Sequence, residues 1–346
     1  MCTAHGPRRV VNRRQAGFSL VELLVASGIG VILTLLIATV FANSSKTGTV
    51  TQSVNEIEEQ AGIALEMLQR DLRQAGYSGC NSNRALGSGG LLNTITAPTA
   101  YLNNIPAYLQ GHEGMGATFS PVAPVQITGA SPAAIRDADA LTVRIPSREP
   151  VALSGTMASA SAVIPVFSTA GFAVGTRALV SDCAQSAVFR VTGLAGGLQH
   201  SVASNSTANL GRAFGVDASV VPFNTVSYYV GLSSIAPLGT ERSLWRRVDS
   251  TAASEEVAEG VEDFELLYGV DTDGDLSADL FDTADNVADW TTVIAVRASL
   301  LLRSKAANAA RNPQAYDFNG QTGVAPGDLR MRRPYNVTIL LRNRTL

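Results

Sequence analysis

One short stretch of the sequence carries enough carboxylates to hold a metal ion. Asp271, Asp273 and Asp275 alternate around a glycine, and Asp279 follows four residues later. Alternating acids of this kind can turn several oxygens toward one hard cation, as Ca²⁺ requires. A loop of the EF-hand kind, however, places glutamate at its twelfth position, where this sequence has Asp282. A solvated Asp/Gly turn explains the same residues without an ion, so a Ca²⁺ site and a turn both remain open.

The other residues of the sequence give little support for a catalytic site. His112 and His200 lie in no recognisable nucleophile or zinc motif, and the sequence holds no GxSxG, P-loop or HExxH pattern. We therefore expect both histidines to be surface or loop residues, and we expect no enzyme. The basic run from Arg330 to Arg333 is expected to be a solvated turn. The net charge of −3 gives no basic footprint that would favour a nucleic-acid partner.

Glu22 is the charged residue with the most unusual surroundings. It is the sole charge between Phe18 and Phe41, a run of apolar or small residues long enough to cross about 30 Å of hydrocarbon as a helix. An ionised carboxylate there costs several kcal/mol and usually marks a function. Four arginines precede the run, so the positive-inside rule places the N-terminus in the cytoplasm and exports the chain after residue 41. A secretory signal peptide and an ordinary single-span anchor are the alternatives.

The residues around Glu22 closely resemble the processing site of type IV prepilins. Gly17 is followed directly by the sequence "FSLVE", which starts at Phe18. The resemblance implies that a prepilin peptidase cleaves after Gly17 and that Phe18 becomes the methylated mature N-terminus. It also implies that Glu22 pairs with the N-terminal ammonium of a neighbouring subunit as the helix moves from the bilayer to the fibre core. An ion pair in an apolar bundle is favourable only when each charge has its partner, so Glu22 is expected to be an assembly residue.

Export also bears on the cysteines. Cys2 would leave with the leader, so the mature chain keeps Cys80 and Cys183 in an oxidising compartment. We expect a disulfide between these two residues, with two separately buried thiols as the alternative. Such a bridge would close a loop of roughly a hundred residues, worth about 4.7 kcal/mol in the chain-entropy model. Metal binding through them is not expected, because no CxxC pair or histidine cluster accompanies them.

One long helix and many short strands are the elements that must position these residues. Apolar residues recur every three or four positions from Val54 to Leu72, which predicts an amphipathic continuation of the apolar helix that Gly76 can end. Residues 43–50 are rich in Ser, Thr and Gly and are a possible interruption, and residues 87–132 have a loop-like pattern. Strands are predicted at 140–145, 177–180, 187–191, 225–230, 244–248, 261–270, 292–302 and 335–341.

This order of elements predicts an α+β fold, in which the long N-terminal helix packs on an antiparallel β-sheet domain. The expected organisation has four parts. They are a basic leader (1–17), a transmembrane helix (18–41), an amphipathic helix that continues it (42–76), and an exported β-rich domain (77–346).

Four further segments narrow the resemblance to PilW-type minor pilins. They are "QRDLRQAGYSGC" from Gln69, "FELLYGVDTDGDLSAD" from Phe264, "WTTVIAVRASLLLRS" from Trp290 and "RRPYNVTILLRN" from Arg332. This resemblance implies a protein that joins other minor pilins and the major pilin, primes pilus assembly on the inner-membrane platform and stays at or near the fibre tip, beneath a PilY-type adhesin. Adhesion, twitching motility and DNA uptake are the activities such pili serve.

Two other functions remain open. A type II secretion pseudopilin of the J kind shares the N-terminal processing site, although the C-terminal resemblance and the chain length argue against it. A membrane-anchored exported enzyme would need a catalytic constellation, which the sequence does not show.

Overall fold

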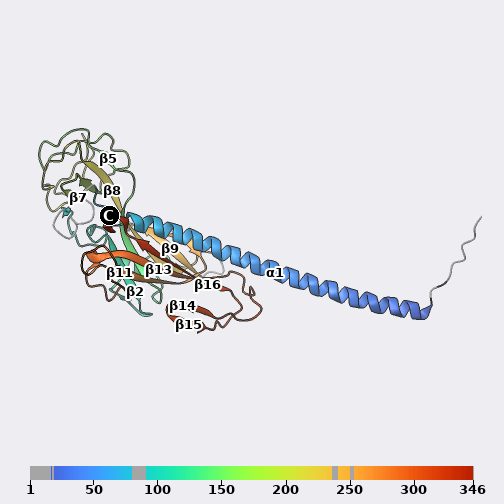
Figure 1. Cartoon of the computed structure of the whole chain (residues 1–346). Helices are drawn as coiled ribbons and strands as arrows, with labels where there is room; N and C mark the ends of the chain where they lie inside the picture. Colours follow the sequence, from blue (N-terminus) through green and yellow to red (C-terminus); the bar gives the residue numbers. More distant parts are fainter. Residues whose placement is uncertain (1–16, 18, 80–90, 236–240, 250–252, 346) are drawn as a thin grey trace, which may run out of the picture. The chain divides into compact units, whose positions relative to one another are not determined.

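The computed structural model describes residues 17, 19–79, 91–235, 241–249 and 253–345. The chain divides into two compact units, residues 1–52 and residues 53–346. All strands of the described residues belong to the second unit (Figure 1). Phe18 and Cys80 lie outside the described residues.

The first element is one α-helix, α1 (Leu20–Gln74), drawn in blue in Figure 1. The hydroxyl groups of Thr34, Thr47 and Thr49 donate to carbonyls four residues earlier, so these polar side chains are satisfied within the helix. The interruption considered at residues 43–50 therefore does not occur. The helix ends before Gly76, whose φ of +75° is the left-handed conformation that glycine adopts without a Cβ penalty.

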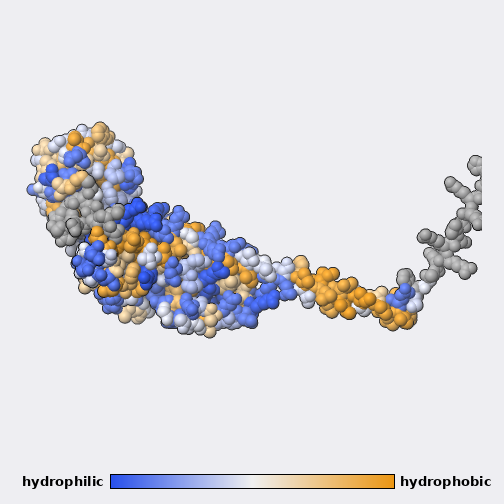
Figure 2. All heavy atoms as spheres, viewed as in Figure 1, coloured by the Kyte–Doolittle hydropathy of each residue, from blue (hydrophilic) through white to orange (hydrophobic). Residues whose placement is uncertain are grey.

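The two parts of α1 differ in their surface. Residues 20–41 are exposed and almost entirely apolar, and Figure 2 shows this part of the helix in orange. By length and composition the helix is able to cross a membrane. From residue 53 onward one face is buried in the second unit, where the following side chains are at most 2% exposed: Ile57, Ala61, Ala64, Leu68 and Leu72. This matches the predicted amphipathic face, except that Ala64 is more deeply buried than Leu65.

A ten-stranded sheet forms the larger layer of the second unit. Its main order is β1-β7-β6-β8-β4-β2-β3, while β5 and β9 also pair with β8, and β10 pairs with β9. Its strands are β1 (Leu91–Asn93), β2 (Leu109–Gly114), β3 (Phe119–Ser120), β4 (Ala140–Pro146), β5 (Val151–Ala152), β6 (Arg177–Ser181), β7 (Ser186–Arg190), β8 (Ser219–Leu232), β9 (Arg242–Val248) and β10 (Glu255–Glu259). All its strand pairs are antiparallel except β1 with β7, so the sheet is mixed.

A four-stranded antiparallel sheet follows in the order β12-β11-β13-β16, with a separate two-stranded hairpin beside it. The strands are β11 (Val261–Val270), β12 (Leu280–Asp282), β13 (Val293–Arg303), β14 (Tyr316–Phe318), β15 (Gln321–Val324) and β16 (Arg332–Leu340). The short helices are α2 (Val125–Thr128), the 3-10 turn η1 (Trp290–Thr292) and α3 (Arg342–Thr345).

The α+β class is confirmed, and each of the eight predicted strands coincides with an observed strand. The loop predicted at residues 87–132 is wrong, because this segment contains β1, β2, β3 and α2. Its strands were not predicted because they are short or have polar residues, such as His112, at buried positions. Such residues break the alternation of apolar and polar side chains that indicates a strand.

Candidate functional site

Glu22 lies in the first turn of α1, next to the predicted cleavage position. The Ser19 hydroxyl accepts a hydrogen bond from the Glu22 amide at 3.1 Å, and the Ser19 carbonyl accepts the amide of Leu23. Ser19 is thus the N-cap and Glu22 the third helical residue, the spacing of a capping box. A carboxylate there also suits the positive end of the helix dipole. The sequence analysis did not predict this capping role, although the pattern Ser-x-x-Glu indicates a capping box.

The second carboxylate of interest on α1 is Asp71, which is 1% exposed. Its Oδ2 accepts hydrogen bonds from the hydroxyl of Tyr228 on β8 at 2.6 Å and from Nε of Arg246 on β9 at 2.9 Å. Burial, followed by the nearby Asp71 charge, raises the pKa of Tyr228, so the phenol remains a donor. This Asp71 anchor, formed by Asp71, Tyr228 and Arg246, fixes the end of the helix to the large sheet.

The structure brings three of the four predicted calcium ligands together. Oxygens of Asp271, Asp273 and Asp275 lie within 4.8 Å of one another. Asp279 is not part of this cluster. Its Oδ2 accepts hydrogen bonds from the amide and the hydroxyl of Thr272, and these bonds lower the pKa of the Asp279 carboxyl. The same loop also has the features of a self-contained turn. Asp271 accepts the amides of Gly274 and Leu276, two residues with positive φ, and so shapes the turn by its own hydrogen bonds.

The chain next to the predicted disulfide is ordered by serine contacts. The carbonyl of Ser78 accepts hydrogen bonds from the hydroxyls of Ser181 at 3.0 Å and Ser186 at 2.6 Å. These two serines end β6 and begin β7, and Cys183 lies in the turn between them. The segment that leads to Cys80 therefore runs beside the turn that carries Cys183. The pairing itself stays a prediction, since Cys80 lies outside the described residues.

Both histidines are buried. The expectation of a surface or loop position is wrong for His112, which lies on a strand, whereas His200 lies in a loop as expected. His112 lies on β2 at 1% exposure, and its Nδ1 is 2.9 Å from the carbonyl oxygen of Pro121. Burial lowers the pKa of His112 to about 4, which keeps the ring neutral. His200 is 4% exposed, with Nε2 at 2.7 Å from the carbonyl of Ala162. Each histidine bonds to a backbone oxygen, as a structural core histidine does.

The basic run at Arg330–Arg333 is a network of ion pairs, not the solvated turn that was expected. Arg332 is bound to Glu262 at 2.6 Å and to Asp328 at 2.7 Å, with its side chain 7% exposed. Arg330 pairs with Glu241, and Arg333 reaches Glu58 on α1. These arginines tie β16 to its surroundings, and their charges are largely neutralised within the domain.

Acidic side chains also meet where the two large sheets join. Asp139 accepts the amides of Gly114 on β2 and Leu266 on β11, each at 2.8 Å, and it lies close to the carboxylates of Glu113 and Glu265. Burial, followed by the Glu113 charge, raises the pKa of Asp139 to about 7. Burial also raises the pKa of both neighbouring glutamates. Burial and mutual repulsion thus favour the protonated form of these carboxylates.

Comparison with protein families gives two matches. Residues 12–38 match the family described as the prokaryotic N-terminal methylation motif, and residues 227–343 match the family described as Type IV Pilus-assembly protein W. The search of curated proteins and the search of solved structures found no match.

The methylation motif, on an apolar helix followed by a β-rich domain, is an arrangement similar to that of prepilin-like proteins. The match over residues 227–343 points to a more specific group within that class. It confirms the resemblance to PilW-type proteins of type IV pili. The match extends from β8 through β16, and it includes the acidic loop and the ion pairs of Arg332. Neither family is enzymatic.

Proposed function

We propose that this protein is a minor pilin that helps prime assembly of a type IV pilus and lies at or near its tip. The observation that carries the proposal is the presence, in one chain, of a methylation motif on an apolar helix and a PilW match on the β-rich domain. The leader of residues 1–17 is removed by a prepilin peptidase. The helix then anchors the protein in the inner membrane, with the domain in the periplasm, before both enter the fibre.

The proposed partners follow from this position. The exposed apolar part of α1 packs among the helices of the major pilin and other minor pilins, while assembly requires the inner-membrane platform. The domain supports a PilY-type adhesin at the tip, and through it adhesion, twitching motility or DNA uptake. No direct contact with nucleic acid is part of the proposal.

The mass of the mature N-terminus tests this function. In cells with the prepilin peptidase, we expect a chain that starts at methylated Phe18, and in cells without the peptidase we expect the leader to be retained. Mass spectrometry of the purified protein from both strains measures this directly. An intact N-terminus in both strains, or a start near residue 43, would contradict a pilin.

We also propose that Cys80 and Cys183 form a disulfide in the exported domain. The contacts of Ser78 with Ser181 and Ser186 support it, because they bring the chain before Cys80 to the turn of Cys183. Peptide mapping under non-reducing conditions is expected to yield one peptide pair joined through these cysteines. Two alkylated free thiols in protein taken from the periplasm would refute the bridge.

For the acidic loop, we propose weak Ca²⁺ binding through Asp271, Asp273 and Asp275, whose oxygens already converge. Calorimetric titration with Ca²⁺ should give heat that Asp273→Ala removes. The matched control is Asp285→Ala, since Asp285 is exposed and follows the loop. If the titration gives no heat and Ca²⁺ does not raise the melting temperature, the loop is a turn held by its own hydrogen bonds.

A further inference from the structure

Four arginines share one face of the ten-stranded sheet. Arg144 pairs with Thr225 across β4 and β8, and Arg177 pairs with Arg190 across β6 and β7 and with Phe223 of β8. Arg247 of β9 pairs with Ser227 of β8. Because paired residues and alternate residues of a strand point to the same side, all four side chains leave the same face.

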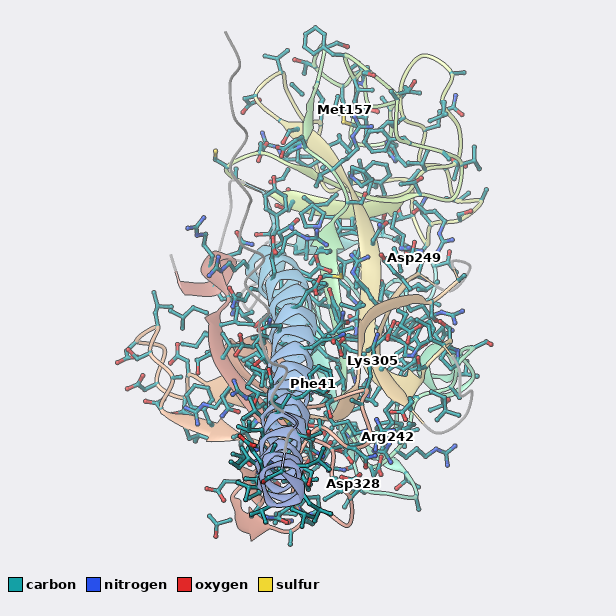
Figure 3. All side chains as sticks on the ribbon, turned by 90° about the vertical axis from the view of Figure 1, so that its right-hand side faces the viewer. Phe41, Met157, Arg242, Asp249, Lys305 and Asp328 are labelled. Atoms are coloured by element: carbon teal, nitrogen blue, oxygen red, sulfur yellow. The ribbon has the colours of Figure 1, made fainter. Side chains whose placement is uncertain are left out.

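Few carboxylates accompany these arginines. Arg144 is 1% exposed, and its guanidinium donates to the carbonyls of Tyr101 and Ala107. Arg177 is 6% exposed and pairs with Asp249 at 2.5 Å, while Arg190 donates to the side chain of Asn103. Asp249 follows β9 (Figure 3) and also accepts the amide of Thr225.

The positive charge in this region exceeds the negative charge. Among three of these arginines, Arg144, Arg177 and Arg190, only Arg177 pairs with a carboxylate, that of Asp249, in the described part of the chain. These three arginines and Asp249 together carry an excess of two positive charges. The undescribed residues contain no aspartate or glutamate that could neutralise it. Burial lowers the pKa of Arg144 to about 10 and also lowers that of Arg190, where the Arg177 charge adds to the effect. Buried charge without a counter-charge is costly, so this region favours a bound anion.

A cavity of about 420 Å³ opens onto two of these arginines, Arg177 and Arg190. Its lining also includes Asn224, Asp249, Gly175 and Thr176. The Nε of Arg177 is buried and has no hydrogen-bond partner. The side chain of Arg177 is thus more than nine-tenths buried, and its Nε keeps an unmet hydrogen-bonding capacity beside the cavity. Guanidinium groups bind phosphate in a bidentate manner, and two of them favour a doubly charged oxyanion.

We propose that this arginine cavity, lined by Arg177 and Arg190, binds a phosphate-like dianion. A phosphate or sulfate dianion neutralises the excess charge. The bound group is either free phosphate or the phosphate of a larger molecule such as a lipid headgroup. Binding at this site does not require assembly into a pilus, since the site uses only residues of the β-rich domain.

Calorimetry of the full chain in detergent micelles, at constant ionic strength in chloride, tests the proposal. Inorganic phosphate and sulfate are the probes for a free ion, and glycerol 3-phosphate is the probe for a headgroup. We expect one saturable site. Binding of inorganic phosphate alone identifies a free ion, and equal or tighter binding of glycerol 3-phosphate identifies a phosphate on a larger molecule. Absence of saturable binding by all three probes overturns the proposal.

Three variants assign the binding to the cavity. Arg190→Gln should weaken binding by about tenfold or more, since a hydrogen bond to a charged group is lost. Arg212→Gln is the matched control, because it removes an ion-paired arginine, 44% exposed, that does not line the cavity. Asp249→Asn should tighten binding, because the competing carboxylate disappears while the side chain still accepts the Thr225 amide. Equal weakening by the two arginine variants, or weaker binding by Asp249→Asn, contradicts the site.

Discussion

Replacing Glu22 with alanine should yield a processed, stable protein that fails to enter pili. In the proposed fibre core, the carboxylate neutralises the N-terminal ammonium of a neighbouring subunit. Without it, that ammonium is left unpaired among apolar helices, at a cost of about 3 to 5 kcal/mol. A cost of this size lowers an association constant by more than about a hundredfold. The measurement is the amount of this protein in sheared pili relative to the amount in the membrane.

The capping box at Ser19 offers a second explanation for any effect of this substitution, and one further variant separates the two. Glu22→Gln keeps a side chain that can take part in a capping box but removes the charge. If the ion pair matters, Glu22→Gln is excluded from pili as strongly as Glu22→Ala. If only the helix start matters, the glutamine variant enters pili normally. Glu59→Ala, an exposed glutamate further along α1, is the matched control and should have no effect.

The long strands were predictable because of their residue composition. β8, β11 and β13 are rich in β-branched and aromatic residues and are bounded by turn residues, so pattern alone located them. The segment "LQGHEG" of β2 has no such pattern, because its buried positions include His112. His112 is tolerated there only because Pro121, nine residues away, supplies an acceptor. A partner of this kind is set by the tertiary structure and leaves no local signal.

The candidate sites also differ in whether a local sequence pattern or the tertiary structure reveals them. The acidic loop and the region around Glu22 are local patterns, so the sequence located both. The arginine cavity takes its two arginines from β6 and β7, and only the pairing of β4, β6, β7, β8 and β9 shows that the four arginines share one face. Asp71 is an intermediate case. It lies three residues after Leu68 and directly before Leu72, within the apolar stripe of an amphipathic helix. A carboxylate in an apolar stripe is the same signal that singled out Glu22, and at Asp71 it marks a buried anchor.

Asp71→Ala should destabilise the β-rich domain strongly. The substitution leaves the Arg246 guanidinium, whose side chain is 14% exposed, and the buried Tyr228 hydroxyl without their shared acceptor. Loss of one partner of a buried ion pair costs about 3 to 5 kcal/mol. For a domain of this size, each kcal/mol corresponds to about 2 to 4 °C, so the melting temperature should fall by roughly 10 °C. Circular dichroism of the full chain in detergent measures the change.

A matched control and a double mutant make the result specific. Asp137→Ala removes a carboxylate 49% exposed that pairs with Arg242, and such surface pairs contribute only about 0 to 1 kcal/mol. The double substitution Asp71→Leu with Arg246→Leu removes both charges, so it should be less destabilising than Asp71→Ala alone. If Asp71→Ala and Asp137→Ala shift the melting temperature equally, the Asp71 anchor does not hold the helix to the sheet. A loss confined to Asp71→Ala means that the end of α1 is fixed by one buried carboxylate, and that an apolar face alone does not specify how the helix docks.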